Sequence, residues 1–70
     1  MTTKELISIE EENLKHFINE REQILREQID AKSEIEFLEA KDRLSMIKDV
    51  IASKQELIKN LKELMDSDII

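Results

Sequence analysis

The sequence predicts an all-α protein, a single helical domain over residues 1–70 folded as an antiparallel hairpin of two helices. Apolar residues recur three and four positions apart over most of the chain, which is the spacing of one helix face. Glycine and proline are both absent, which disfavours the tight turns of β proteins. The apolar repeat changes phase near residues 30–33, and we expect the chain to turn there.

The first helix is expected from about residue 3 to residue 30. Its apolar stripe contains Leu6, Ile7, Leu14, Phe17, Ile18, Ile24, Leu25 and Ile29. Thr2 and Glu5 fit the capping-box pattern, in which a hydroxyl and a carboxylate three residues apart bind free backbone N–H groups. Thr2 is therefore expected to lie at the start of this helix.

The second helix is expected from about residue 33 to residue 65, followed by a frayed tail over residues 66–70. Its stripe contains Phe37, Ala40, Leu44, Ile47, Ile51, Ile58, Leu61 and Met65. The stripe follows a seven-residue repeat in which Lys54 occupies one position. Ser33 and Glu36 form a second capping box. Asp66 and Asp68 lie at the negative end of the helix dipole, which favours fraying.

A single long coiled-coil helix is the main alternative to the hairpin. The expected turn, residues 30–33, lacks the glycine that usually ends a helix. A helix continued through this segment would, however, place the second stripe about 80° from the first. Because one continuous seam would not form, the pattern favours a hairpin.

The chain offers little material for a core. Only 40% of its residues are hydrophobic, and without cysteine it has no disulfide. Chains of this size usually need a disulfide, a metal or association to be stable. Apolar flanks are also expected outside the hairpin, at Leu6, Phe17, Ile24, Val50, Leu57 and Leu64. We therefore expect two hairpins to pair as a homodimer that forms a four-helix bundle, with a tetramer as the larger alternative.

These features predict a non-enzymatic protein-interaction module. We expect a small, self-associating helical regulator or adaptor that binds another protein through apolar helix faces. The expected interface residues are Leu14, Phe17, Ile18, Leu25, Leu44, Ile47, Ile51, Ile58 and Leu61. Some of them must pack inside the hairpin, and the sequence does not distinguish these from the rest.

An acidic surface suggests an alternative function. The chain has 17 acidic and 11 basic residues, and a formal net charge of -6. Carboxylates along a rigid helix would replace phosphates and occupy the basic site of a nucleic-acid-binding protein. The candidates are Glu10, Glu11, Glu12, Glu20, Glu22 and Glu27. The simpler interpretation is a solvated face with ion pairs such as Glu11–Lys15 and Glu39–Arg43.

No catalytic, cofactor or metal site is predicted. His16 has Glu12 and Glu20 four residues away on either side, which we interpret as an exposed histidine on a polar face. Direct nucleic-acid binding is disfavoured, because phosphates require clustered lysine and arginine. The polar N-terminus and short apolar runs predict no signal peptide, no membrane segment and a cytoplasmic location. The composition suggests a bacterial or phage origin.

Overall fold

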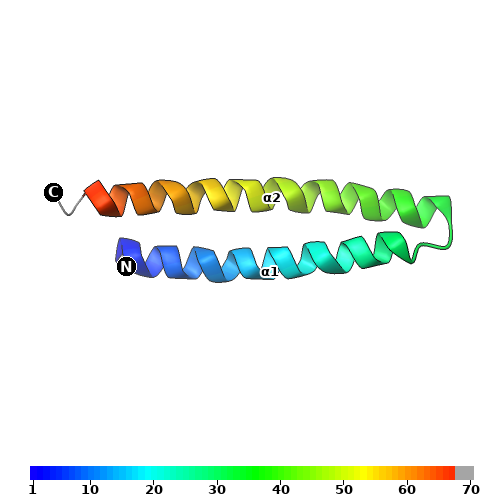
Figure 1. The fold of residues 1–70 in the computed structure, drawn as a ribbon, viewed down its shortest axis with the longest axis horizontal. Coiled ribbons are helices and arrows are strands. Elements are labelled where there is room, and N and C mark those ends of the chain that lie inside the picture. The colour runs from blue at the N-terminus through cyan, green and yellow to red at the C-terminus, as the bar shows by residue number, and fades with distance from the viewer. Residues whose placement is uncertain (68–70) are drawn as a thin grey trace.

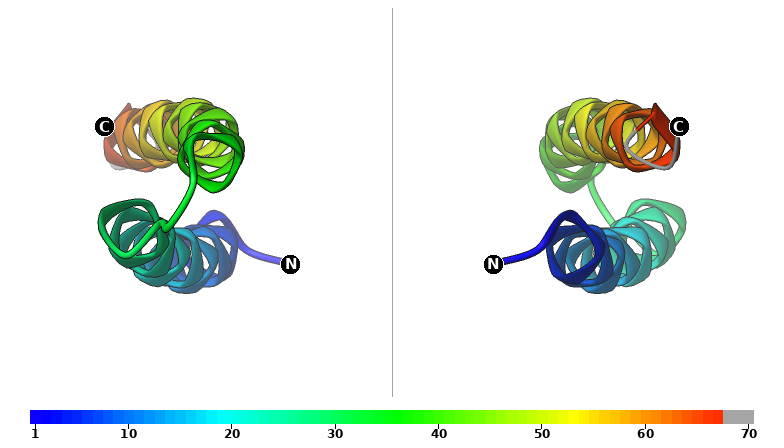
Figure 2. Two further views of the ribbon diagram at one scale, coloured as in Figure 1. Left: turned by 90° about the vertical axis from the view of Figure 1, so that its right-hand side faces the viewer. Right: turned by 90° about the vertical axis from the view of Figure 1, so that its left-hand side faces the viewer.

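A computed structural model shows a two-helix antiparallel hairpin (Figure 1). It describes residues 1–67, with Ser67 described by its backbone alone. Helix α1 spans Thr3–Ile29 and helix α2 spans Glu34–Ser67. The hairpin measures 56 × 15 × 15 Å between Cα atoms, and its helices cross at a shallow angle (Figure 2). The predicted all-α fold class is confirmed. The single long helix is excluded, because the chain reverses between α1 and α2.

Helix α1 begins at the predicted cap and ends without a left-handed residue. The backbone N–H of Glu5 donates to Oγ1 of Thr2 over 3.1 Å. At the other end, the N–H of Asp30 donates to the carbonyl of Arg26 over 2.9 Å. The backbone angles of Asp30 are φ −86° and ψ 0°. No residue of the described chain has a positive φ angle. The turn therefore forms without the conformation that favours glycine.

Helix α2 begins with a variant of the predicted capping box. The N–H of Glu36 donates to Oγ of Ser33 over 3.2 Å. The Glu36 carboxylate accepts a hydrogen bond from the N–H of Lys32 over 3.0 Å, one residue earlier than the standard box would have it. The helix continues to Ser67, two residues beyond the predicted end. The last three residues of the predicted frayed tail lie outside the described residues.

The interior of the hairpin is one seam from each helix, and each seam follows a seven-residue repeat. The α1 seam contains Ile7, Glu10, Leu14, Phe17, Arg21, Ile24 and Gln28, and Ala31 in the turn continues its repeat. The α2 seam contains Ala40, Leu44, Ile47, Ile51, Lys54, Ile58, Leu61 and Met65. All sixteen positions are buried or half-buried.

Ile24 corrects one expectation about the first helix. It was predicted to lie on an exposed flank, but it is only 1% exposed and packs against Ala40 and Leu44. Phe17, predicted on the same flank, occupies a half-buried seam position. The error has a physical cause. The seam of α1 passes through polar positions such as Arg21 and Gln28, which a stripe of apolar residues alone omits. Once these positions are included, Ile24 takes its place in the seam, three residues after Arg21 and four before Gln28.

The α2 seam can be tested with Ile51→Asp. Ile51 is 4% exposed, and burying a carboxylate there without a partner is unfavourable. We expect the free energy of unfolding to fall by at least about 3 kcal/mol, measured by urea denaturation followed by circular dichroism. The control is Ala52→Asp at the adjacent exposed position, where the loss should be much smaller. Equal stability in the two variants would contradict the seam.

The cap of α2 can be tested with Ser33→Ala. Removal of Oγ leaves the N–H of Glu36 without its intramolecular acceptor. We expect a loss of about 1 kcal/mol in the free energy of unfolding. Ser45→Ala, at an exposed position inside α2, is the matched control and should be neutral or slightly stabilising. A Ser33→Ala variant as stable as the Ser45→Ala variant would show that the cap does not matter.

Candidate functional site

A partly buried ion pair joins the two seams. Nζ of Lys54 in α2 lies 2.6 Å from Oε2 of Glu10 in α1. The Lys54 side chain is 27% exposed and the Glu10 side chain 13% exposed. Polar residues in a coiled-coil seam select one register, because any other register leaves them buried without a partner. The pair therefore aligns the open end of the hairpin.

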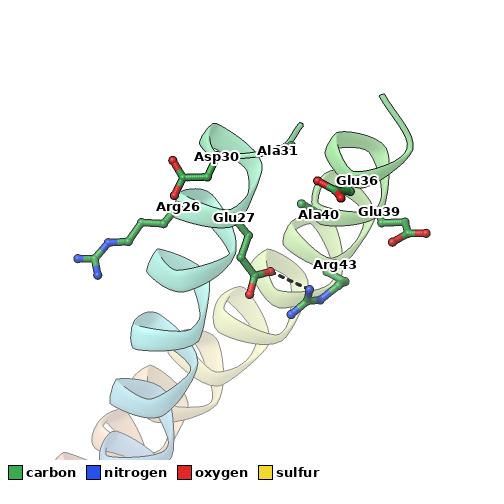
Figure 3. Close-up of a pocket in the computed structure, with 8 residues that line it drawn as sticks. All are labelled: Arg26, Glu27, Asp30, Ala31, Glu36, Glu39, Ala40 and Arg43. Carbon is green, nitrogen blue, oxygen red and sulfur yellow. Dashed lines mark hydrogen bonds and ion pairs between the residues drawn. The ribbon is translucent and has the colours of Figure 1, made fainter. Parts of the chain in front are cut away.

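The ion pairs on the surface differ from those predicted. Arg43 reaches across the hairpin to Glu27, with 2.8 Å between Nη1 and Oε2, rather than pairing with Glu39 in its own helix (Figure 3). Lys15 lies 3.8 Å from Glu12 rather than pairing with Glu11. Both observed pairs have side chains more than half exposed, and such pairs contribute little to stability.

The six carboxylates of the predicted acidic surface do not form one surface. Glu10 points into the seam and binds Lys54, and Glu27 binds Arg43. Glu12 pairs with Lys15. The remaining three are exposed, but Glu11 and Glu22 lie on one side of α1, because three turns separate them, and Glu20 lies on the other.

The hairpin has two broad faces, which we define by the residues that line hollows between the helices. The first face carries the Glu27–Arg43 pair and is lined near the turn by Glu20, Asp30, Glu36 and Glu39. The second face is lined near the turn by Leu25, Lys41, Ser45 and Lys48, and near the chain ends by Lys4, Glu11, Lys62 and Asp66.

An apolar patch covers the first face near the chain ends. Val50 and Leu57 line a hollow beside Lys54, and Leu64 follows Leu57 by two helical turns. These three side chains are 36%, 41% and 55% exposed, which agrees with the flank expected from the sequence. Leu6 and Ile9 lie on the same face, because Leu6 precedes Glu20 by fourteen residues and Ile9 precedes His16 by seven. We call this group the open-end patch: Leu6, Ile9, Val50, Leu57 and Leu64.

A second apolar patch lies on the opposite face near the turn. Leu25, which is 38% exposed, lines the second face, and Ile18 and Ile29 lie two turns before it and one turn after it. Leu38 lies two turns before Ser45 on α2 and is 46% exposed. We call this group the turn-end patch: Ile18, Leu25, Ile29 and Leu38. The two patches therefore occupy opposite ends of opposite faces.

The nine predicted interface residues divide into two groups. Leu44, Ile51 and Ile58 are buried between the helices of the hairpin. Four more occupy half-buried seam positions: Leu14, Phe17, Ile47 and Leu61. Only Ile18 and Leu25 lie outside the seams. The sequence analysis did not assign Ile9 and Leu38 to a surface. Their positions follow from the seven-residue spacing to His16 and Ser45, once the structure shows which face these two polar residues line.

Residues 1–67 contain neither a metal-ligand cluster nor a helix suited to span a membrane. Within residues 1–67, no three histidine, aspartate or glutamate side chains come together as a metal-ligand set. His16 is exposed and lines the first face with Asn19 and Gln23. Over the same residues, neither helix has an apolar stretch long enough to cross a bilayer.

Comparisons with protein-family models, curated proteins and solved structures found no significant match. The hairpin and its exposed surfaces therefore carry the functional argument.

The Glu10–Lys54 pair can be tested by removing one partner and then both. Lys54→Met leaves the largely buried Glu10 carboxylate without its cation, and we expect a loss of about 1–2 kcal/mol in the free energy of unfolding. The double variant Glu10→Leu with Lys54→Leu should recover most or all of that loss, because apolar side chains pack in the seam without a desolvation penalty. Urea denaturation measures both. A Lys54→Met variant as stable as the native chain would contradict a role for the pair.

Proposed function

We propose that this chain is a non-enzymatic protein-interaction module, a small regulator or adaptor that self-associates and binds other proteins through exposed apolar helix faces. The observation that carries the proposal is the open-end patch. Three of its leucine and valine side chains line one edge of α2 at two-turn intervals and are 36% to 55% exposed. Exposed apolar surface that repeats along a helix is typical of helix-docking sites.

The shape of the hairpin supports the same conclusion. Two helices side by side bury only the stripe where they meet, so each retains an apolar flank. The buried hydrophobic core of the described chain contains six residues, of which one is alanine. A core of this size is small for an independent domain, and association is the usual compensation in a chain with no cysteine.

The partner chemistry follows from the surface. The open-end patch is bordered by the exposed polar residues Asn13, Ser53 and Asn60. Asp49 and Lys54, of opposite charge, also line its hollow. It suits the apolar face of an amphipathic helix, from a second copy of this chain or from another protein. Pairing two hairpins by such faces gives four helices in two layers, the proposed homodimer.

The structure gives less support to the nucleic-acid-mimicking alternative. A mimic requires a row of carboxylates on one surface, but Glu10 and Glu27 are paired with cations across the hairpin. Glu20 lies on the first face, whereas Glu11 lies on the second. Their separation weakens the resemblance to a phosphate backbone.

Self-association can be tested by sedimentation equilibrium over a wide concentration range, with circular dichroism on the same samples. We expect a mass above the 8.3 kDa of one chain and a helicity that stays high. Leu57→Ser should weaken association at least about tenfold, because burial of one leucine contributes about 2 kcal/mol.

The control is Ile35→Ser. Ile35 is 70% exposed on α2 but belongs to neither patch, so its removal should leave association unchanged. A native chain that stays monomeric at every concentration would contradict the proposed self-association. A pull-down with native and Leu57→Ser chains would then test whether the patch binds another protein.

A further inference from the structure

Charged residues, like the apolar patches, are concentrated in one half of each face. On the first face, charged residues gather near the turn, where five acidic and two basic residues line the hollows. They are Glu20, Arg26, Glu27, Asp30, Glu36, Glu39 and Arg43, and their formal net charge is -3. The open-end patch occupies the other half of this face, where the charges of the two charged lining residues, Asp49 and Lys54, cancel. The first face therefore has an acidic half and an apolar half.

The second face has the reverse arrangement. Near the chain ends it carries Lys4, Lys62, Glu11 and Asp66. Lys15 and Lys59 lie on the same face. Lys15 follows Ser8 by seven residues and Lys59 precedes Asp66 by seven, and both reference residues line this face. These six residues have a formal net charge of +2. The turn-end patch occupies the other half of the face, bordered by Lys41, Lys48 and Glu22, which precedes Ile29 by seven residues.

We propose that copies of this chain stack with the first face of one hairpin on the second face of the next and with their ends reversed. This inference rests on the self-association proposed above and specifies its geometry. A half-turn about the axis normal to the hairpin plane brings the acidic half of one copy over the basic half of the other. The same half-turn brings the open-end patch over the turn-end patch, so α1 of one copy lies over α2 of its neighbour.

Individual side chains match in this arrangement. Val50, Leu57 and Leu64 of one copy face Ile18, Leu25 and Ile29 of the next. On the acidic half, Glu20 of α1 comes over the region of Lys59 and Lys62. Glu39 of α2 comes over the region of Lys4 and Lys15. Opposite charges thus flank an apolar contact, which fixes both the partner face and its direction.

Symmetric pairings are less complementary. If two first faces meet with their ends aligned, the acidic halves repel; with their ends reversed, each acidic half covers an apolar patch. Two second faces give the same conflict with lysines. The proposed contact joins unlike faces, so each pair leaves one first face and one second face free. Such contacts add further copies instead of closing at two.

The size of the faces is sufficient for a stable contact. A face 56 Å long and 15 Å wide between Cα atoms offers about the 800 Å² per partner that a standard protein interface buries. The homodimer is then the first step of the stack, and larger assemblies follow as concentration rises.

Charge reversal on each face tests this geometry. The first-face variant is Glu20→Lys with Glu39→Lys, and the second-face variant is Lys4→Glu with Lys62→Glu. All four residues are exposed. In low salt, each variant alone should associate at least about tenfold more weakly than the native chain, because like charges then meet in every contact. Sedimentation equilibrium measures the mass, and circular dichroism checks that the hairpin remains folded.

A mixture of the two variants tests whether the first face of one copy meets the second face of another. An equimolar mixture of the two variants should recover the native mass distribution, because every contact between the two chains then joins opposite charges. The variant with all four substitutions in one chain, whose net charge is again -6, should also recover it. The control is Asp42→Lys with Glu56→Lys, which makes the same charge change on the outward edge of α2 and should associate at least as well as the native chain.

Each remaining outcome overturns a defined claim. If the native chain associates but neither variant is weakened, or the mixture does not recover, then self-association stands and the stacked geometry is wrong. If the control is weakened as much as the first-face variant, net charge rather than face matching governs association, and the geometry is again wrong. A monomeric native chain overturns the proposed self-association and this inference together.

Discussion

The alignment of the two helices is the constraint on which the rest of the structure depends, and both the short turn between them and the Glu10–Lys54 pair in the seam hold it. Two seams with a seven-residue repeat can slide past each other by two turns and still place apolar residues together. Such a slide would put Lys54 beside Phe17 and leave Glu10 in the seam without its cation. The observed pairing, with 2.6 Å between the charged atoms, avoids both costs. The register then determines which residues of α1 and α2 share a face.

The thinness of the hairpin explains its surfaces. A two-helix layer has no third element to cover its broad sides, so residues beside the seam remain in contact with water. In such a chain, the residues beside the seam are either polar, and so solvated, or apolar, and so available to bind another surface. Here, each face has a charged half and an apolar half. Each end of the hairpin thus has one charged side and one apolar side, and the two ends carry them on opposite faces. Such an arrangement would give a partner both a position and a direction.

Local chemistry explains why the helix ends were predictable. Thr2 and Ser33 bind backbone N–H groups three residues further along, an interaction that depends only on neighbours in the sequence. Packing between helices was harder to predict. Ile24 was expected on a flank because the apolar stripe of the first helix omits the polar positions Arg21 and Gln28, which continue the seam repeat. Lys54 was recognised as a seam position, but its partner was not.

The sequence by itself determined two amphipathic helices, their caps and the place of the turn, because periodicity and capping involve residues at most a few turns apart. It also indicated that apolar flanks such as Leu57 would stay outside. Only the tertiary structure decided that Glu10 meets Lys54 and that Arg43 reaches Glu27 across the hairpin. Those contacts join residues 44 and 16 positions apart. Pairings at such separations depend on how two helices align in space, which the pattern within either helix does not specify.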